Sequence, residues 1–430
     1  MVAEWLLLFW YTPIVYTAFT AAGQIAYRRN KKKLGKRPPV QRIIYQIPTI
    51  GNGEECNRIL RKIRKYKWPA PLETWVIIDE EYYRPDMRFE CDRLVIVPRD
   101  FVTACKFKSR SLEYARRLRL KLVEEGKLEP NYIVIQSDDD SLPSEEFVRE
   151  SLEVGADVVI GSITPRPIGH LFPDYERPVA CNMTCLFATN VGRPVWGHGE
   201  GMCLSARADR LISYEPEEPG KHLISSEDLY VLHKASDFVT EDVYFLYVAR
   251  HVSLAEDQEH VQKANRKGLK IFASKERVYI TPPLTARDMV RQRRRWLWGH
   301  IRLIRRGLLP KSNLAVIAFA ESSGLVTYAA ATTLGVLAPL GIVHVPPHFA
   351  ALGWVTLGLW FGFRGFCVGR VMGLKHGLRA ALLSFPTVTA NFAYHVIGLL
   401  KGDPKRFDVI RKYVPEGGDG VDGKKDGTGA

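Results

Sequence analysis

The chain has 430 residues, a hydrophobic share of 46% and a formal net charge of +14. This length is sufficient for a catalytic core with additional elements, and the composition permits both a soluble domain and membrane segments. The basic residues form no stripe interleaved with aromatic residues, and zinc-finger spacing is absent, so we do not expect nucleic acid as a partner. Basic residues beside apolar segments fit anionic membrane lipids and phosphate-bearing substrates better. The seven cysteines form no metal-ligand pattern, which predicts reduced thiols.

The N-terminal residues have the pattern of a membrane anchor. Residues 5–23 carry no charge and are long enough to cross a hydrocarbon layer of ~30 Å as a helix. The basic stretch 27–37 follows at once, and by the positive-inside rule it places the next domain in the cytoplasm. A cleaved signal peptide is the alternative, but its basic residues would precede the apolar run. We therefore predict a transmembrane anchor at residues 1–26.

Residues 38–285 are predicted to form a cytoplasmic catalytic domain. Short β-branched runs indicate buried parallel strands at residues 42–49, 73–79, 92–98 and 131–136. The stretches 54–66 and 106–126 between them have helical periodicity, and Gly126 ends the second. This βαβ pattern predicts a doubly wound α/β sheet with ligands at the carboxyl ends of its strands. Residues 160–250 are less regular, and we interpret them as an acceptor-side subdomain.

Charged residues follow two of these strands. Asp79 ends the strand at 73–79, so the carboxyl-end rule places it beside the ligand crevice. Three cations at a probable helix start suit a diphosphate by charge, although a charged surface is the alternative; they are Lys106, Lys108 and Arg110.

Asp138 and Asp140 directly follow the strand at 131–136. Alternate strand residues point the same way, so these two carboxylates could address a divalent cation that also holds two phosphates. An acidic turn, with Asp or Ser capping the helix that starts near Pro143, explains the same residues equally well.

The dipeptide Glu-Asp occurs three times, at 227–228, 241–242 and 256–257. The third pair precedes a predicted short helix that Gly268 ends. Carboxylates at a helix start are stabilised by the helix dipole in any protein, so a structural role is open for each pair.

The C-terminal third is predicted to associate with the membrane. Residues 286–312 fit an amphipathic helix in the membrane interface. Residues 313–400 contain three apolar stretches of spanning length, at 313–343, 348–369 and 377–400. Three crossings would leave the basic tail outside, against the charge rule, so one stretch could be re-entrant, interfacial or split in two. The tail 401–430 is predicted to be cytoplasmic and disordered at its end.

Taken together, five motifs in order resemble the inverting, membrane-integrated glycosyltransferases that include the cellulose, chitin and hyaluronan synthases. These motifs are strand-Asp79, "KFKSRSLEYA", the strand followed by Asp-x-Asp, Glu-Asp, and "QRRRW" at 292–296. "KFKSRSLEYA" and the stretch from "AED" to "RQRRRW" are most similar to egghead-type β-1,4-mannosyltransferases. The resemblance covers about residues 42–310 and implies a GT-A-like fold.

This resemblance also selects one Glu-Asp pair. Gly268 follows Asp257 by 11 positions, and Gln292 follows Gly268 by 24, both as the family pattern asks. Asp242 fits neither distance, although "VTED" matches the commonest family spelling and "LAED" replaces its threonine with alanine. Asp242 is the second candidate, and Asp228 is expected to be structural.

The resemblance implies a role for each matched residue. Asp257, with Glu256, would be the catalytic base, and Asp138 and Asp140 would hold Mg²⁺ or Mn²⁺ on the donor diphosphate. The other expected donor contacts are Asp79, Lys106, Lys108, Arg110, Gln292 and Arg295. The expected acceptor contacts are Trp296, His198, Gly199 and Glu200, although a Gly-rich turn and an interfacial helix would also explain these residues.

The activity implied is transfer of mannose from the nucleotide sugar GDP-mannose, in β linkage, to a lipid-linked sugar acceptor by a multi-pass integral membrane protein. Glucosyl or N-acetylglucosaminyl transfer is a close alternative. A processive β-polysaccharide synthase would need more crossing helices for a channel. A nucleotidyltransferase and a non-catalytic membrane scaffold are the alternatives from other classes.

Overall fold

The computed structural model describes residues 12–166, 175–194, 199–216, 256–283, 285–309, 340–342 and 346–404. Three residues singled out in the sequence lie outside these ranges: His198, Asp228 and Asp242.

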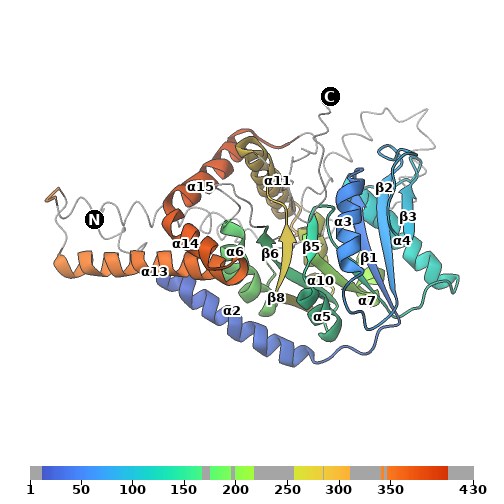
Figure 1. Cartoon of the computed structure of the whole chain (residues 1–430), viewed down its shortest axis with the longest axis horizontal. Coiled ribbons are helices and arrows are strands. Elements are labelled where there is room, and N and C mark those ends of the chain that lie inside the picture. Colours follow the sequence, from blue (N-terminus) through green and yellow to red (C-terminus); the bar gives the residue numbers. More distant parts are fainter. Residues whose placement is uncertain are drawn as a thin grey trace.

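An eight-stranded sheet with strand order β3-β2-β1-β4-β7-β6-β8-β5 lies at the centre of the structure (Figure 1). One half contains the four strands that the sequence predicts, namely β1 (Arg42–Thr49), β2 (Leu72–Asp79), β3 (Arg93–Val97) and β4 (Tyr132–Gln136). Every neighbouring pair among them is parallel, as predicted. In β1, each position after Arg42 is buried. A parallel strand covered on both faces gives such a continuous apolar run.

The other half of the sheet is mixed. Its strands are β5 (Ser141–Pro143), β6 (Val158–Pro165), β7 (Met202–Ser205) and β8 (Ile271–Ile280). β7 is antiparallel to both β4 and β6, and β5 is antiparallel to β8, whereas β6 and β8 are parallel. The α/β class is confirmed. β6 and β7, which fall largely within residues 160–250, lie inside the main sheet. The acceptor-side role of these residues stays a prediction.

The helices on the catalytic domain include α3 (Gly53–Ile63), α4 (Lys108–Glu124), α5 (Glu145–Glu153), α7 (Ala206–Leu211) and α10 (Glu256–Arg266). The chain leaves α4 and α10 through Gly126 and Gly268, both with a φ of +67°, which glycine adopts without steric cost. Ser144 caps α5 by accepting a hydrogen bond from the backbone N–H of Phe147 at 3.2 Å.

A buried ion pair joins α4 and α7 to the sheet. The fully buried guanidinium of Arg119 donates to both carboxylate oxygens of Asp209, at 2.8 and 2.7 Å. It also donates to Oε1 of Gln46 on β1 at 2.6 Å, and the Tyr132 hydroxyl on β4 donates to Asp209 at 2.7 Å. The pair is therefore hydrogen-bonded on all sides, as buried charges require.

The described part of the predicted N-terminal anchor is helical. Helix α2 (Thr12–Leu34) continues beyond residue 26 through the basic stretch. Its Asn30 donates to Oδ1 of Asn190 at 2.9 Å, and Nζ of Lys31 lies 2.5 Å from Oε1 of Glu150. The C-terminal half of α2 is thus attached to the catalytic domain, and residues 1–11 of the predicted span lie outside the described ranges.

Three apolar helices follow at the C-terminal end: α13 (Pro347–Met372), α14 (Leu374–Leu382) and α15 (Ser384–Leu400). Figure 1 shows α13 and α2 extending away from the sheet on the same side. Within the described ranges, one segment, Ala351–Met372, has the length and composition to cross a membrane. The predicted stretch 377–400 is divided into α14 and α15 at Leu383. Most of the stretch 313–343 lies outside the described residues.

Candidate active site

The carboxyl ends of β1, β2 and β4 lie at the same edge of the sheet, because these strands are parallel neighbours. Asp79 is the last residue of β2 and is buried. Arg110 of α4 forms an ion pair with Asp79, and Ser111 Oγ donates to its Oδ2 at 3.0 Å. Burial raises the pKa of the Asp79 carboxyl, and the charge of Arg110 opposes this shift. Arg110 is thus directed to Asp79, one of the predicted nucleotide contacts.

The Asp-x-Asp motif forms a turn. β4 ends at Gln136, and the backbone N–H of Ser141 donates to the carbonyl of Asp138 at 3.1 Å. The side-chain alternation of a strand therefore does not extend to Asp138 and Asp140. Asp139 turns towards β1, where the Thr49 hydroxyl donates to its Oδ2 at 2.8 Å.

Asp138 and Asp140 differ in their surroundings. Asp140 is buried, and the hydroxyl of Ser141 donates to its Oδ1 at 2.9 Å. Burial raises the pKa of Asp138 above its ordinary value, and the negative charges of Glu200 and Asp140 raise it further. The positive charge of Lys108 lowers the pKa of Asp138 and so opposes this shift. Several acidic groups therefore share one region whose charge a cation would balance.

Lys108 joins the Asp-x-Asp turn to the selected Glu-Asp pair. Its Nζ lies 2.9 Å from Oδ1 of Asp138 and 3.3 Å from Oδ2 of Asp257. Lys108 is the first residue of α4, directly after Phe107, whose φ of +56° is uncommon for a residue with a side chain. Lys106, two positions earlier, is half-buried, and this burial lowers the pKa of its ammonium. Asp138 and Asp257 are 119 positions apart in the sequence, yet one ammonium contacts both.

Asp257 lies in the first turn of α10 and packs on Gly199. A Cβ built on Gly199 would lie 1.9 Å from Oδ1 of Asp257, so only a glycine leaves room for this carboxylate. Gly199 begins the short turn Gly199–Gly201 between residues 195–198, which lie outside the described ranges, and β7. The predicted base and a residue of the predicted acceptor pocket are thus in contact, as expected for a base that acts on the acceptor hydroxyl.

The predicted acceptor residues Glu200 and Trp296 meet at Arg177. Nη1 of Arg177 lies 3.3 Å from Oε1 of Glu200, and its guanidinium carbon lies 4.3 Å from the Trp296 ring centre. Arg293 contacts the same ring at 4.5 Å. The Arg293 side chain is held by Asn391 of α15, whose Oδ1 accepts from its Nε at 3.0 Å. Cation–π contacts therefore occupy the indole that was predicted to stack on a sugar.

The remaining predicted donor contacts lie on α11 (Ala286–Arg305), which begins where the helix at 286–312 is predicted to begin. Gln292 is buried, and its Oε1 accepts from Nη1 of Arg293 at 3.3 Å. Arg295 is half-buried one position before Trp296. Hydrogen bonds and ion pairs join α11 to α15 and the residues after it, including Arg302 with Asp403 at 2.7 Å.

Three residues of this region have no signature in the sequence. Arg177 belongs to the short helix α6 (Glu176–Ala180). Tyr214 stacks on His260 of α10 with ring centres 4.4 Å apart, and its hydroxyl donates to Oε1 of Gln136 at 2.9 Å. This stack connects the helix that carries Asp257 to the end of β4. The one sequence feature that points to this stack is the position of His260, one turn after Asp257.

Within the described ranges, no group of three or more His, Cys, Asp or Glu side chains could hold a metal ion such as Mg²⁺ or Mn²⁺. Mg²⁺, however, is commonly bound through one or two carboxylates together with substrate phosphates. Asp138 and Asp140 supply carboxylates of this kind, and their mutual repulsion favours a nearby cation. The two carboxylates can therefore hold a divalent cation weakly, and the phosphates of a bound diphosphate would complete its coordination.

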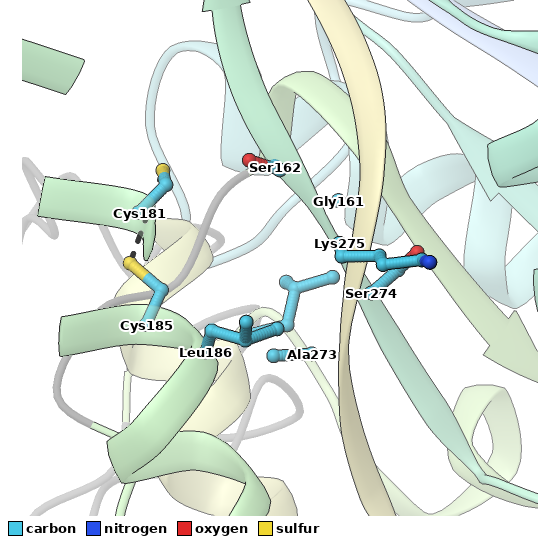
Figure 2. A pocket seen from close by; sticks show the side chains of 9 residues that line it. Gly161, Ser162, Cys181, Cys185, Leu186, Ala273, Ser274 and Lys275 are labelled. Atoms are coloured by element: carbon cyan, nitrogen blue, oxygen red, sulfur yellow. Dashed lines mark hydrogen bonds between the residues drawn. The ribbon is translucent and has the colours of Figure 1, made fainter. Parts of the chain in front are cut away.

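A separate cavity lies between the sheet and the π-helical segment Cys181–Thr189. Figure 2 shows Cys181, Cys185 and Leu186 on one side of it and residues of β6 and β8 on the other. The two sulfur atoms are 4.0 Å apart. None of the predicted site residues lines this cavity.

Comparisons with known proteins identify the family of this chain. The model of glycosyl transferase family group 2 matches residues 132–392, which is more than half of the chain. Among solved structures, the mannosyltransferase PcManGT from Pyrobaculum calidifontis in complex with GDP-Man and Mn2+ is 16% identical, with a TM-score of 0.41, over 92% of this chain and 98% of that one. TarS from S. aureus is 13% identical, with a TM-score of 0.28, over 88% of this chain and 98% of that one. No curated protein sequence matches. On the family match, this chain belongs to glycosyl transferase family group 2.

Proposed function

We propose that this glycosyltransferase is a metal-dependent inverting hexosyltransferase that uses mannose from GDP-mannose and forms a β linkage to a membrane glycolipid. The observation that carries the proposal is the contact of Lys108 with both Asp138 and Asp257, which brings the expected donor and base residues to one place. The choice of mannose rests on the resemblance of "KFKSRSLEYA" and "QRRRW" to egghead-type enzymes.

The proposed reaction is one in-line displacement. An oxygen of Asp257 takes the proton of an acceptor hydroxyl, and the acceptor oxygen attacks the anomeric carbon from the side opposite the diphosphate. The bond from that carbon to the diphosphate oxygen breaks, so an α-linked donor gives a β-glycoside and a nucleoside diphosphate. The contact with Gly199 fixes the direction of the Asp257 carboxylate during this step.

Charge on the leaving group has to be stabilised. A bound Mg²⁺ or Mn²⁺ would neutralise the diphosphate, with Asp138 and Asp140 as its protein ligands. Arg295 is proposed to pair with the diphosphate, because a guanidinium binds phosphate oxygens in bidentate fashion. Asp79 is proposed to contact the nucleotide, with its carboxylate held in place by Arg110 and Ser111.

The acceptor is proposed to bind beside Trp296. A sugar that stacks on this indole has to displace a guanidinium, and Arg177 is the more accessible of the two. Arg177 is half-buried, whereas Arg293 is buried and is held by Asn391. Glu200, which pairs with Arg177, lies beside this position and is proposed to contact the sugar hydroxyls.

Membrane attachment is part of this proposal. The segment Ala351–Met372 is long and apolar enough to cross a bilayer, and several large apolar side chains of α13, α14 and α15 are exposed. We propose a multi-pass protein with its catalytic domain in the cytoplasm. The boundaries 1–26, 38–285, 286–312, 313–400 and 401–430 stay predictions.

The test is a screen of sugar nucleotides with membrane lipids, in which products are identified by mass spectrometry with and without a chelator. We expect GDP and a lipid with one added mannose, and no product with chelator. Transfer from a UDP-sugar would replace the donor assignment, and long chains would indicate a processive synthase. Release of pyrophosphate would indicate a nucleotidyltransferase, and a lack of turnover with every donor would favour a scaffold.

A further inference from the structure

The ammonium of Lys108 lies between two carboxylates that have different roles in the proposed function. It is 2.9 Å from Oδ1 of Asp138, and 3.4 and 3.3 Å from Oδ1 and Oδ2 of Asp257. We infer that Lys108 takes the place of the donor-bound cation in the substrate-free enzyme, so that donor loading displaces Lys108 and releases Asp257 as a base. This inference rests on the proposed function and adds to it an order of events, in which donor loading precedes the release of Asp257.

Lys108 and a divalent cation compete for Asp138. Both are positive, and both would lie within bonding distance of the same carboxylate, so each disfavours the other by like-charge repulsion. Asp138 and Asp140 lie in one turn, so their negative charges favour a positive group beside them, and Nζ of Lys108 lies 2.9 Å from Oδ1 of Asp138. The lysine supplies this positive charge while no cation is present.

The same lysine limits the reactivity of Asp257. A base has to present an oxygen lone pair to the acceptor hydroxyl, and both Asp257 oxygens are within 3.4 Å of the ammonium. In the substrate-free state Asp257 is therefore an obstructed base towards water or an acceptor, because the ammonium occupies the side of the carboxylate that both oxygens face.

Donor loading provides a new position for Lys108. Its four-carbon stem is flexible, and its ammonium binds phosphate as a point charge. A cation on Asp138 repels the ammonium while the arriving diphosphate attracts it, so both forces act in the same direction. Because Asp257 becomes reactive only afterwards, the enzyme binds donor before acceptor can react.

A purely structural ion pair is the competing explanation, and the two make different predictions for Lys108→Met. If the lysine only stabilises the fold, its removal lowers the melting temperature and leaves cation affinity unchanged. If it competes with the cation, its removal raises cation affinity. Lys108→Arg keeps the positive charge and should behave like wild type in cation binding.

The experiment measures Mn²⁺ binding to the full chain by electron paramagnetic resonance without nucleotide. We expect Lys108→Met to bind Mn²⁺ about tenfold more tightly than wild type, the effect of removing one competing contact of about 1.4 kcal/mol. Lys121→Met is the matched control, because Lys121 lies on the same helix with a side chain that is 71% exposed. It removes the same charge and should leave Mn²⁺ affinity unchanged.

A second arm adds GDP. GDP should strengthen Mn²⁺ binding to wild type more than it strengthens Mn²⁺ binding to Lys108→Met. Only wild type has the Lys108 ammonium, which can move from Asp138 to the diphosphate. Equal or weaker Mn²⁺ binding by Lys108→Met without nucleotide overturns the inference, as does a lack of Mn²⁺ binding by both proteins. Tighter binding by Lys108→Met without sugar transfer by wild type would support the competition and reject the proposed activity. Sugar transfer by wild type, with the same Mn²⁺ affinity in wild type and Lys108→Met, would support the proposed activity and reject the competition.

Discussion

Gly199 lies directly against the carboxylate of Asp257. A Cβ at position 199 would be 1.9 Å from Oδ1 and 2.2 Å from Oδ2, closer than non-bonded atoms can approach. The atoms in its way are the end of a short side chain and not backbone. A methyl group here would therefore move the proposed base while the fold stays intact.

Gly199→Ala is accordingly expected to lower kcat by about 100-fold, the effect of displacing a catalytic group by about 1 Å. The free energy of unfolding should change little. Gly358→Ala on α13 is the control, because a Cβ at Gly358 meets no atom within 4 Å. Steady-state transfer assays and thermal unfolding of both variants test this relationship. Wild-type turnover by Gly199→Ala would show that the position of the Asp257 carboxylate does not matter for catalysis.

The buried pair Arg119–Asp209 predicts a stability effect away from the site. Arg119→Met leaves the Asp209 carboxylate buried without its counter-charge, and we expect the free energy of unfolding to fall by about 3–5 kcal/mol. Arg61→Met removes an exposed ion pair with Glu90 at 3.5 Å and should change the free energy of unfolding by less than about 1 kcal/mol. Urea unfolding of the two variants makes the comparison. Equal losses would mean that the buried pair contributes no more than a surface pair.

His260 predicts how stability depends on pH. Burial lowers the pKa of its imidazole from 6.5 to about 3, so the folded protein keeps it neutral. The unfolded chain binds a proton below about pH 6.5, so the stability present above that pH is lost as pH falls from 6.5 towards 3. Phe has no titratable group and can keep the stack on Tyr214.

The difference is measured by urea unfolding of wild type and His260→Phe at pH 7 and pH 5. Wild type should lose about 2 kcal/mol more than His260→Phe over this interval. An equal loss in the two proteins would mean that His260 titrates normally in the folded state.

Part of the fold follows from the sequence because its signals are local. β1 to β4 are continuous β-branched runs, and Gly126 and Gly268 end their helices with left-handed backbone. β6 and β7 were not predicted as strands of the main sheet. β6 contains Gly161, where a Cβ would lie 2.4 Å from Val278, and β7 has only four residues. The β-branched residues of β6 are a local strand signal that Gly161 interrupts, whereas the four residues of β7, Met202–Ser205, carry little strand signal of their own.

The candidate site likewise contains residues that the sequence could identify and residues that only the structure brings together. Asp79, Asp138 and Asp257 could be selected from strand ends and from spacing to Gly268. Arg177 could not, because its relevance comes from contacts with Glu200 and Trp296, which are distant in sequence. Even for Lys108 the sequence predicts a phosphate contact, whereas its carboxylate partners depend on how α4 and α10 pack.

The central claim is that Asp257, and not Asp242, is the catalytic base. The most direct measurement is the turnover of Asp257→Asn and Asp242→Asn with GDP-mannose and the lipid acceptor identified by the screen. Asp257→Asn should lose about 100-fold or more in kcat, the usual contribution of a general base, and Asp242→Asn should stay near wild type. Wild-type turnover by Asp257→Asn together with loss in Asp242→Asn would contradict the assignment and favour the pair with the commoner spelling.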